Sequence, residues 1–309
     1  MKKLYYISDI HLELRNNKIL TFSPENLKED NYLALCGDIG CPFHPNYTKF
    51  LNVHSELYTH IFIITGNHEY YSGNKQRTVS ETDAKITELV STYSNITFLT
   101  TNKPYQIGKT LFIGCPLWSQ VDLAAESKMN DYNRIYVESH IPHPTSYRKP
   151  SSFGRTKKVW NKAGRKLISY TDVLSMHTEM LDYLTQAINY DFSNMELNED
   201  FDPNKIEKII VLTHHAPSFK MLDQTVSTEN PVFDSEDSDD WDKPVYIPNV
   251  DNCYATDCEF LFRSPVICWI SGHTHECKEE KIKGISCVSN CFGYPGQETG
   301  FVLNKSIDF

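Results

Sequence analysis

The 309-residue sequence lacks three features that mark common classes of protein. It has no Cys-x-x-Cys pair among its nine cysteines, which argues against a zinc site built from thiolates. It has no apolar run of about 18 residues, so we expect no membrane-spanning helix. It also lacks an excess of positive charge. With 30 basic and 40 acidic residues, the formal net charge is −10, which argues against strong binding to duplex DNA.

The cysteines are odd in number and scattered along a chain that is not small. Such usage suits a reducing compartment better than a disulfide framework. The apolar run near the N-terminus ends at Ser8-Asp9, which is too early for a signal peptide. We therefore expect a cytoplasmic protein. The composition is 40% hydrophobic and 12% aromatic, which is ample for a packed core.

Short apolar runs bounded by turn-forming residues alternate with amphipathic segments, and this alternation predicts an α/β layered fold. Two helices are expected, at 80–93 and at 171–189. The expected N-terminal caps are Ser80 with Asp83 for the first helix and Thr171 or Asp172 for the second. The predicted strands are 4–8, 32–36, 61–65, 96–99, 110–114, 208–213, 266–271, 285–289 and 300–303.

Two stretches interrupt the alternation. Residues 139–166 are loop-like and basic, whereas residues 219–250 are loop-like and strongly acidic. Loops of this length in a compact domain are often functional lids or inserts. We predict a single domain over residues 1–309 with loop insertions at these two places.

Five of the predicted strands are followed directly by side chains that bind metals. Oxygen and nitrogen donors brought to the ends of neighbouring strands are what a pair of divalent cations needs. One such fragment would be weak support, but five in order along the chain point to one site. The fragments are Asp9-Ile10-His11, Gly37-Asp38, Gly66-Asn67-His68-Glu69, His214-His215 and Gly272-His273-Thr274-His275.

Two of these fragments share a spacing. Asp9 and His11 are two residues apart, which in an extended chain points both side chains the same way. His273 and His275 repeat this spacing, so we predict that each pair grips a metal. The alternative for the first pair is a turn-capping aspartate beside a surface histidine. Asp38 has two carboxylate oxygens that can bridge two cations, and the alternative is an ordinary turn residue.

The remaining fragments supply single groups. Asn67 offers a neutral amide oxygen, which leaves net positive charge at the site to attract phosphate. We predict that His68 is the general acid that protonates the leaving oxygen; the alternative is a structural or metal-binding histidine. Glu69 is a candidate to orient an imidazole. His214 is preferred to His215 as a ligand because it is nearer the strand end.

The five motifs D-x-H, G-D, G-N-H-[ED], H and G-H-x-H occur intact and in order, and the sequence resembles the calcineurin-like metallophosphoesterase superfamily. Pro116-Leu117-Trp118 and other local stretches look like a microbial and viral branch. The resemblance implies a four-layer α/β/β/α sandwich with two central mixed β-sheets and a dinuclear site. It implies His68 as the proton donor. The implied ligands are Asp9, His11, Asp38 and His275 on one metal, and Asp38, Asn67, His214 and His273 on the other.

The resemblance further implies phosphate-ester hydrolysis through a metal-bridging hydroxide. The nitrogen and oxygen ligand set excludes thiolate-loving metals but does not distinguish manganese, iron, zinc, cobalt and nickel. Manganese is the expected metal, with the other four as alternatives. Ser/Thr protein phosphatases of the superfamily carry an arginine soon after G-D, whereas here Asp38 precedes Ile39-Gly40-Cys41-Pro42. This difference argues against phosphoproteins. The favoured substrate is a small organic phosphodiester or nucleotide, which a basic insert closing over the site would suit. The alternatives are a phosphomonoesterase, a nuclease disfavoured by the charge, and an inactive metal-binding interaction scaffold.

Two further groups are candidates for contacts with substrate. Arg134 and Asp131 are substrate-binding candidates, and the alternative is a salt-bridged turn. The basic insert could close over the substrate, with cations for phosphates and aromatic rings for a base; the alternative is a solvated loop. The insert's candidates are Arg148, Arg155, Lys157, Lys158, Lys162, Tyr147, Phe153 and Trp160.

Overall fold

The computed structural model describes residues 2–15, 20–26, 30–121, 123, 129–150, 156–222, 231–233, 244–246 and 251–309. Two large β-sheets dominate this part of the chain. In spatial order, the first sheet consists of β17 (Ser306–Asp308), β1 (Lys3–Ile7), β2 (Asn31–Cys36), β3 (His60–Ile64) and β4 (Ile96–Phe98). The second consists of β15 (Glu279–Ile282), β16 (Ile285–Ser289), β14 (Val266–Ser271), β11 (Lys208–Thr213), β6 (Thr110–Cys115) and β5 (Tyr105–Ile107).

Both sheets are mixed, as predicted. Strands β1 to β4 run parallel, and β17 pairs antiparallel with β1 at the edge. In the second sheet the four inner strands are parallel, whereas β15 and β5 pair antiparallel at the edges. The parallel strands are buried on both faces, which explains why they read as continuous apolar runs.

The two sheets pack face to face. Successive side chains of β1 alternate, with Leu4 and Tyr6 in the core between the sheets and Tyr5 and Ile7 on the opposite face. Phe62 of β3 stacks on Phe112 of β6 across this inner core, with ring centroids 4.2 Å apart. The inner layers are therefore fixed by apolar contacts between strands far apart in sequence.

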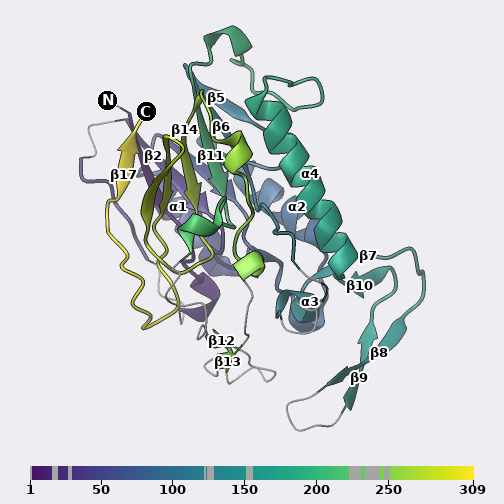
Figure 1. Ribbon diagram of the computed structural model, residues 1–309. Helices are drawn as coiled ribbons and strands as arrows, with labels where there is room; N and C mark the ends of the chain where they lie inside the picture. Colours follow the sequence, from purple (N-terminus) through teal and green to yellow (C-terminus); the bar gives the residue numbers. More distant parts are fainter. Residues whose placement is uncertain are drawn as a thin grey trace.

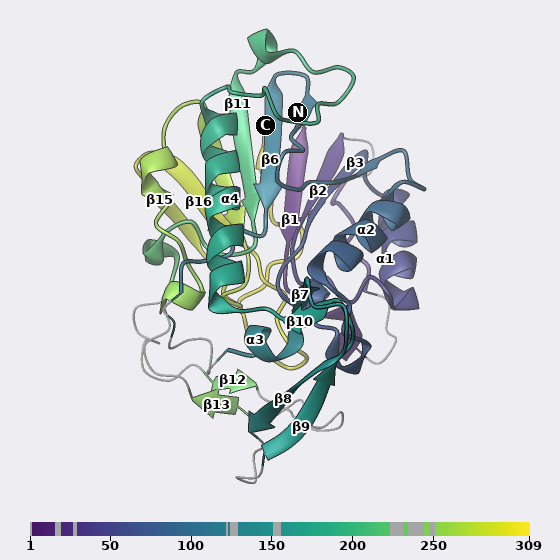
Figure 2. The same cartoon turned by 90° about the vertical axis from the view of Figure 1, so that its right-hand side faces the viewer.

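Helices cover the two outer faces. Helices α1 (Pro45–Ser55) and α2 (Val79–Val90) lie on the side of β1 to β3, and α4 (Tyr170–Ile188) lies over β6 and β11 (Figures 1 and 2). This arrangement confirms the predicted α/β/β/α sandwich. In the described part of the chain, no helix combines the length and apolarity that crossing a membrane requires.

The helices are close to their predicted positions, but their N-cap residues are not those expected, although Asp172 takes part in the cap of α4. Helix α2 begins with a capping box between Thr78 and Glu81, two residues before the expected pair. Helix α4 begins with a capping box between Ser169 and Asp172. The expected Ser80–Asp83 cap is therefore wrong, because Thr78 already satisfies the first free N–H groups of α2.

Three other sequence expectations are corrected. The predicted strand 300–303 is irregular, and β17 closes the first sheet instead. Helix α1 was not expected. The basic stretch is a hairpin rather than a loop, and a smaller pair of strands lies in the acidic stretch. The additional elements are α3 (Asp131–Arg134), β7 (Tyr136–Glu138), β8 (Thr145–Pro150), β9 (Thr156–Asn161), β10 (Arg165–Leu167), β12 (Pro231–Phe233) and β13 (Pro244–Tyr246).

The β8–β9 hairpin projects from the body of the molecule (Figure 2). Its base is anchored by Gln76, which donates to the Trp160 carbonyl and accepts from the Lys162 N–H, both at 2.7 Å. The Trp160 side chain is 56% exposed. The acidic run at 235–242 lies outside the described residues. So do the side chains of the remaining basic and aromatic candidates, Tyr147, Arg148, Phe153, Arg155, Lys157 and Lys158.

Two histidines away from the candidate site, His54 and His60, are buried. The His54 ring donates through Nδ1 to the Phe50 carbonyl at 2.8 Å, and its Nε2 accepts from the Phe22 N–H at 3.0 Å. This pairing requires the neutral imidazole, because a protonated Nε2 would face another donor. Burial accordingly lowers the pKa of His54 to about 4.

We expect His54 to make the protein less stable in mild acid. Its pKa is depressed in the folded state, so the unfolded state takes up the proton first as the pH falls below about 6.5. The stability that the neutral ring contributes is therefore present above about pH 6.5 and lost as the pH falls toward about 4, with about 2 kcal/mol gone by pH 5. Urea unfolding at several pH values should show a weaker acid dependence for His54→Gln than for the wild type. Identical slopes would contradict this account.

Candidate metal centre

All five motif fragments lie at the carboxyl ends of parallel strands. Strands β1, β2 and β3 end at Ile7, Cys36 and Ile64, just before the first three fragments. Strands β11 and β14 deliver the other two from the second sheet. Because the carboxyl ends of parallel strands share one edge and the two sheets pack together, the fragments converge there. Three groups of side chains have ligand atoms within 4.8 Å of one another.

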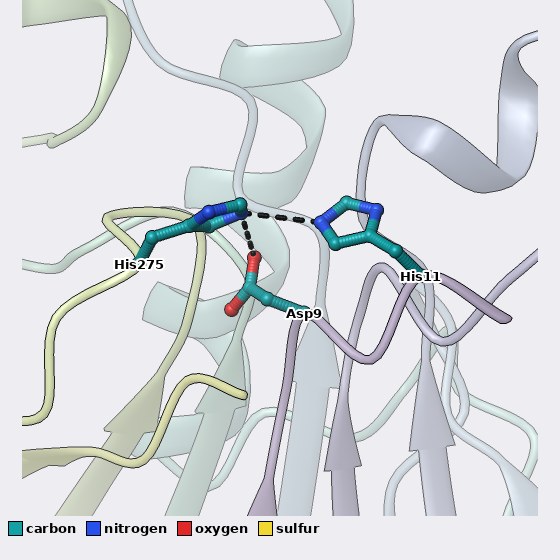
Figure 3. A group of neighbouring side chains, drawn as sticks. All are labelled: Asp9, His11 and His275. Atoms are coloured by element: carbon teal, nitrogen blue, oxygen red, sulfur yellow. Dashed lines mark hydrogen bonds and ion pairs between the residues drawn. The ribbon is translucent and has the colours of Figure 1, made fainter. Parts of the chain in front are cut away.

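The first group contains Asp9, His11 and His275. The Nε2 atoms of His11 and His275 lie 3.1 Å apart, and His275 Nε2 lies 3.4 Å from Asp9 Oδ1 (Figure 3). Burial would raise the pKa of Asp9, but the neighbouring His275 imidazole holds it below its usual range. These three side chains, from opposite ends of the chain, present donor atoms to one point.

The second group contains Asp38, His214 and His273, with Asn67 beside them. His214 Nε2 lies 3.5 Å from Asp38 Oδ2 and 3.2 Å from Asn67 Oδ1. His214 Nδ1 donates to the Cys36 carbonyl at 2.9 Å, which leaves Nε2 as the atom that faces the group. His273 Nε2 is buried and has no hydrogen-bond partner among the described residues.

Asp38 joins the two groups. Its Oδ2 lies 3.8 Å from His11 Nε2 and 3.5 Å from His214 Nε2, so one carboxylate oxygen faces ligands of both groups. Its Oδ1 accepts from the His68 N–H at 2.8 Å, which fixes the carboxylate. Gly66 must be glycine here, because a Cβ would overlap Asp38 Oδ1. This position suits the bridging role predicted for Asp38.

The backbone at the site is left-handed at five candidate ligands. The φ angles of Asp9, His11, Asp38, His273 and His275 lie between 48° and 68°. Non-glycine residues rarely adopt this conformation, which costs about 1–3 kcal/mol each and is concentrated at functional sites. The expectation of extended pairs is therefore wrong in its geometry. The paired side chains lie close together because these left-handed residues turn the chain sharply after each strand.

His68 lies between a carboxylate and a phenol. Its Nδ1 is 3.4 Å from Glu13 Oε1, and its Nε2 is 3.4 Å from the Tyr294 hydroxyl. Burial would lower the pKa of His68, but Asp38 and Glu13 raise it above the ordinary value. His68 also forms the third group with His11 and Asp38. Its role as proton donor rather than ligand stays a prediction.

Glu69 does not orient an imidazole. Its carboxylate accepts backbone N–H groups from both neighbouring fragments, so it ties the first G-D loop to the G-N-H loop. The donors are Asp38, Ile39, Gly40 and Gly66, at 3.0, 2.7, 3.3 and 2.8 Å. His215 packs beside the site, with its ring 4.2 Å from that of His273 and its Nδ1 3.0 Å from the Pro116 carbonyl oxygen.

Asp131 lies behind Asn67. Its Oδ1 accepts from Asn67 Nδ2 at 2.9 Å and from the Tyr71 hydroxyl at 2.8 Å. This contact turns the amide so that Asn67 Oδ1 faces His214. The Arg134 guanidinium lies 5.5 Å from the centre of the Tyr71 ring. Asp131 thus contacts a candidate ligand, and substrate binding by Asp131 and Arg134 stays a prediction.

Three residues at the site were not expected from the sequence. Glu13 contacts His11 and His68, and Gln297 Oε1 lies 2.7 Å from His275 Nδ1. Tyr294 packs its ring against those of His11 and His275. Glu13 extends the two-residue spacing of Asp9 and His11, a signal that could have identified it. Tyr294 and Gln297 lie in an irregular segment that carries no such signal.

Fold and cluster together define the metallophosphoesterase class. The family model for calcineurin-like phosphoesterases matches residues 2–277, and the chain belongs to this family. It is 30% identical over 317 residues to uncharacterized protein L509 of Acanthamoeba polyphaga mimivirus, covering 100% of this chain and 97% of that protein. The crystal structure of phosphopantetheinyl hydrolase (PptH) from Mycobacterium tuberculosis superposes with a TM-score of 0.56 at 14% identity, covering 95% of this chain and 90% of that one. At 14% identity, the similarity to PptH shows a shared fold only.

The residues present fit the metals that the family implies. The donor set consists of imidazole nitrogens and carboxylate and amide oxygens, which suit divalent transition metals. A bound cation would give the buried Nε2 atom of His273 the partner that it lacks among the described residues. Asp38 has a pKa well below its usual range because its imidazole neighbours, His214 first, outweigh burial, whereas burial lowers the pKa of His273. Ionised carboxylate and neutral imidazole are the forms that bind metal.

Proposed function

We propose that this phosphoesterase hydrolyses small organic phosphate esters with two divalent cations, manganese being the favoured metal. One observation carries the proposal: a single oxygen of Asp38 lies between His11 of one group and His214 of the other. A carboxylate shared by two ligand groups suits a pair of cations about 3.5–4 Å apart. The nine free cysteines fit the reducing cytoplasm as the compartment.

The proposed ligands are those that the motifs define. One cation would be held by Asp9, His11, Asp38 and His275, and the other by Asp38, Asn67, His214 and His273. When bound, the cations polarise phosphoryl oxygens and lower the pKa of a water that attacks phosphorus. The neutral Asn67 amide adds no negative charge, so the site keeps an attraction for phosphate.

The protein's own groups orient this chemistry. The Cys36 carbonyl and Gln297 hold the Nδ1 atoms of His214 and His275, so that each Nε2 faces the site. Asp131 accepts a hydrogen bond from Asn67 Nδ2, which leaves Asn67 Oδ1 facing the site. His68 lies next to Asp38, where its Nε2 can give a proton to the departing oxygen as the P–O bond breaks.

The proposed substrate is a phosphodiester or nucleotide. Two features support a small substrate over a phosphoprotein: the residues directly after the G-D motif, Ile39-Gly40-Cys41-Pro42, include no arginine, and a projecting hairpin flanks the end of the sandwich that carries α3 (Figure 2). A phosphomonoester is the alternative for the same site, and an interaction scaffold without turnover is the alternative to an enzyme.

Matched p-nitrophenyl esters test the proposal. We expect the purified protein with added Mn²⁺ to hydrolyse a p-nitrophenyl phosphodiester faster than the corresponding monoester. His273→Ala should abolish turnover, whereas His143→Ala, which changes an exposed histidine, should not. Faster hydrolysis of the monoester would make phosphomonoesters the substrate class. No turnover of either ester with manganese, iron, zinc, cobalt or nickel would favour the interaction scaffold.

A further inference from the structure

We propose that Glu13 is a positioning residue that, together with Tyr294, holds the imidazole of His68 for proton transfer, an inference that rests on the proposed function. Glu13 lies in the 3₁₀ turn Leu12–Leu14, directly after His11. Its Oε1 is 3.4 Å from His68 Nδ1. The Tyr294 hydroxyl is 3.4 Å from the other ring nitrogen. The imidazole is thus contacted at both nitrogens by groups that the family motifs do not include.

The Glu13 contact decides which nitrogen of His68 faces the site. A carboxylate oxygen only accepts, so the proton on Nδ1 points at Glu13. The second proton of the imidazolium then sits on Nε2, beside the Tyr294 hydroxyl. The His68 N–H donates to Asp38 Oδ1 at 2.8 Å, so the ring is also tied to the candidate bridging ligand. A proton donor must be held in reach of the departing oxygen, and these three contacts supply that constraint.

Tyr294 comes from a segment beyond the residues that the family model matches. Its ring centroid lies 4.6 Å from that of His11 and 4.4 Å from that of His275. Its N–H donates to Gln297 Oε1 at 3.0 Å, and the same oxygen is 2.7 Å from His275 Nδ1. Gln297 therefore places the tyrosine and a candidate ligand together. The C-terminal segment completes the site in this chain.

The proton transfer balances as follows. The oxygen of the attacking water forms a bond to phosphorus, and the bond from phosphorus to the ester oxygen breaks. The electron pair of that bond takes the proton from His68 Nε2, which leaves a neutral imidazole held by Glu13 on Nδ1. The water gives up one proton to solvent, and solvent returns one to Nε2 before the next turnover. No oxidant or reductant takes part.

Leaving-group dependence tests Glu13 without relying on fold or metal content. A nitrophenolate departs without a proton, whereas an alkoxide needs one. For two phosphodiesters that differ only in leaving group, we expect Glu13→Gln to lower kcat on the alkyl ester about 10²-fold and on the p-nitrophenyl ester far less. KM and the bound Mn²⁺ should stay near wild type. Tyr294→Phe, which keeps the ring and removes the hydroxyl, should show the same selectivity with a smaller loss.

A double variant separates Glu13 from the rest of the site. In a His68→Ala background, Glu13→Gln should cost almost nothing more on the alkyl ester, because the group that it positions is gone. Glu13 also lies 3.2 Å from His11 Nδ1. Equal losses on both esters, or loss of Mn²⁺ from Glu13→Gln, would show that it acts on His11 and overturn the inference. Failure of the wild type on both esters would instead refute the proposed function. If Glu13→Gln does not fold, Tyr294→Phe provides the test, and equal losses of kcat on the two esters would overturn the inference.

Discussion

Asp38→Asn is expected to weaken metal binding at both positions and to remove nearly all activity. The substitution replaces one oxygen with an amide nitrogen and removes the negative charge shared by two groups of imidazoles. Loss of an indirect contact to a metal ligand already costs about 10–100-fold in affinity, so a shared ligand should cost at least about 100-fold. Metal content after dialysis, together with kcat/KM, measures the effect.

A matched control makes this result specific. Asp200→Asn makes the same chemical change at an exposed aspartate and should leave metal content and activity unchanged. The Asp38 carboxylate also fixes the His68 N–H, so circular dichroism should show that the variant is folded. Two tightly held ions in folded Asp38→Asn would count against the bridge.

His68→Ala is expected to have the opposite pattern, with metals retained and activity lost. If His68 protonates the leaving oxygen, its removal should lower kcat on the alkyl phosphodiester about 10²–10⁴-fold, and far less on the p-nitrophenyl ester. Glu13 and Tyr294, which the ring contacts, are not among the seven proposed ligand residues, so Mn²⁺ content should stay at the wild-type level. His140→Ala, at an exposed position, is the control.

The metal content of His68→Ala decides between the two readings of this residue. His68 lies close enough to His11 and Asp38 to form a ligand group with them. Loss of one ion on substitution would therefore make His68 a ligand and remove it as the proton donor. Full activity with both ions bound would leave it with neither role.

Much of the fold was predictable because each buried parallel strand is a continuous run of apolar residues in the sequence. Strands β11, β14 and β16 have the bounds expected from their apolar runs. The projecting β8–β9 hairpin contains no such apolar run. Its strands are short of apolar residues, since most of the β8–β9 sequence is polar or basic, and polar hairpins and loops look alike in composition. The N-caps of α2 and α4 lie two or three residues before the expected positions because Ser, Thr and Asp cluster there.

The site was predictable as far as its residues follow strands directly. Asp9, Asp38 and His214 each come within two residues of a strand end, and parallel strands place such ends together. The left-handed backbone was not predictable, because only a few per cent of non-glycine residues adopt it and the residue spacing does not indicate which ones. Tyr294 and Gln297 lie in an irregular segment, where the spacing of residues does not predict which way their side chains point.

The electron paramagnetic resonance spectrum of the protein loaded with Mn²⁺ tests the central claim most directly. Two cations that share the Asp38 carboxylate about 3.5–4 Å apart should give the signal of an exchange-coupled pair at two ions per chain. Asp38→Asn should abolish that signal. A spectrum of isolated Mn²⁺ ions at full loading, or saturation at one ion per chain, would contradict the account.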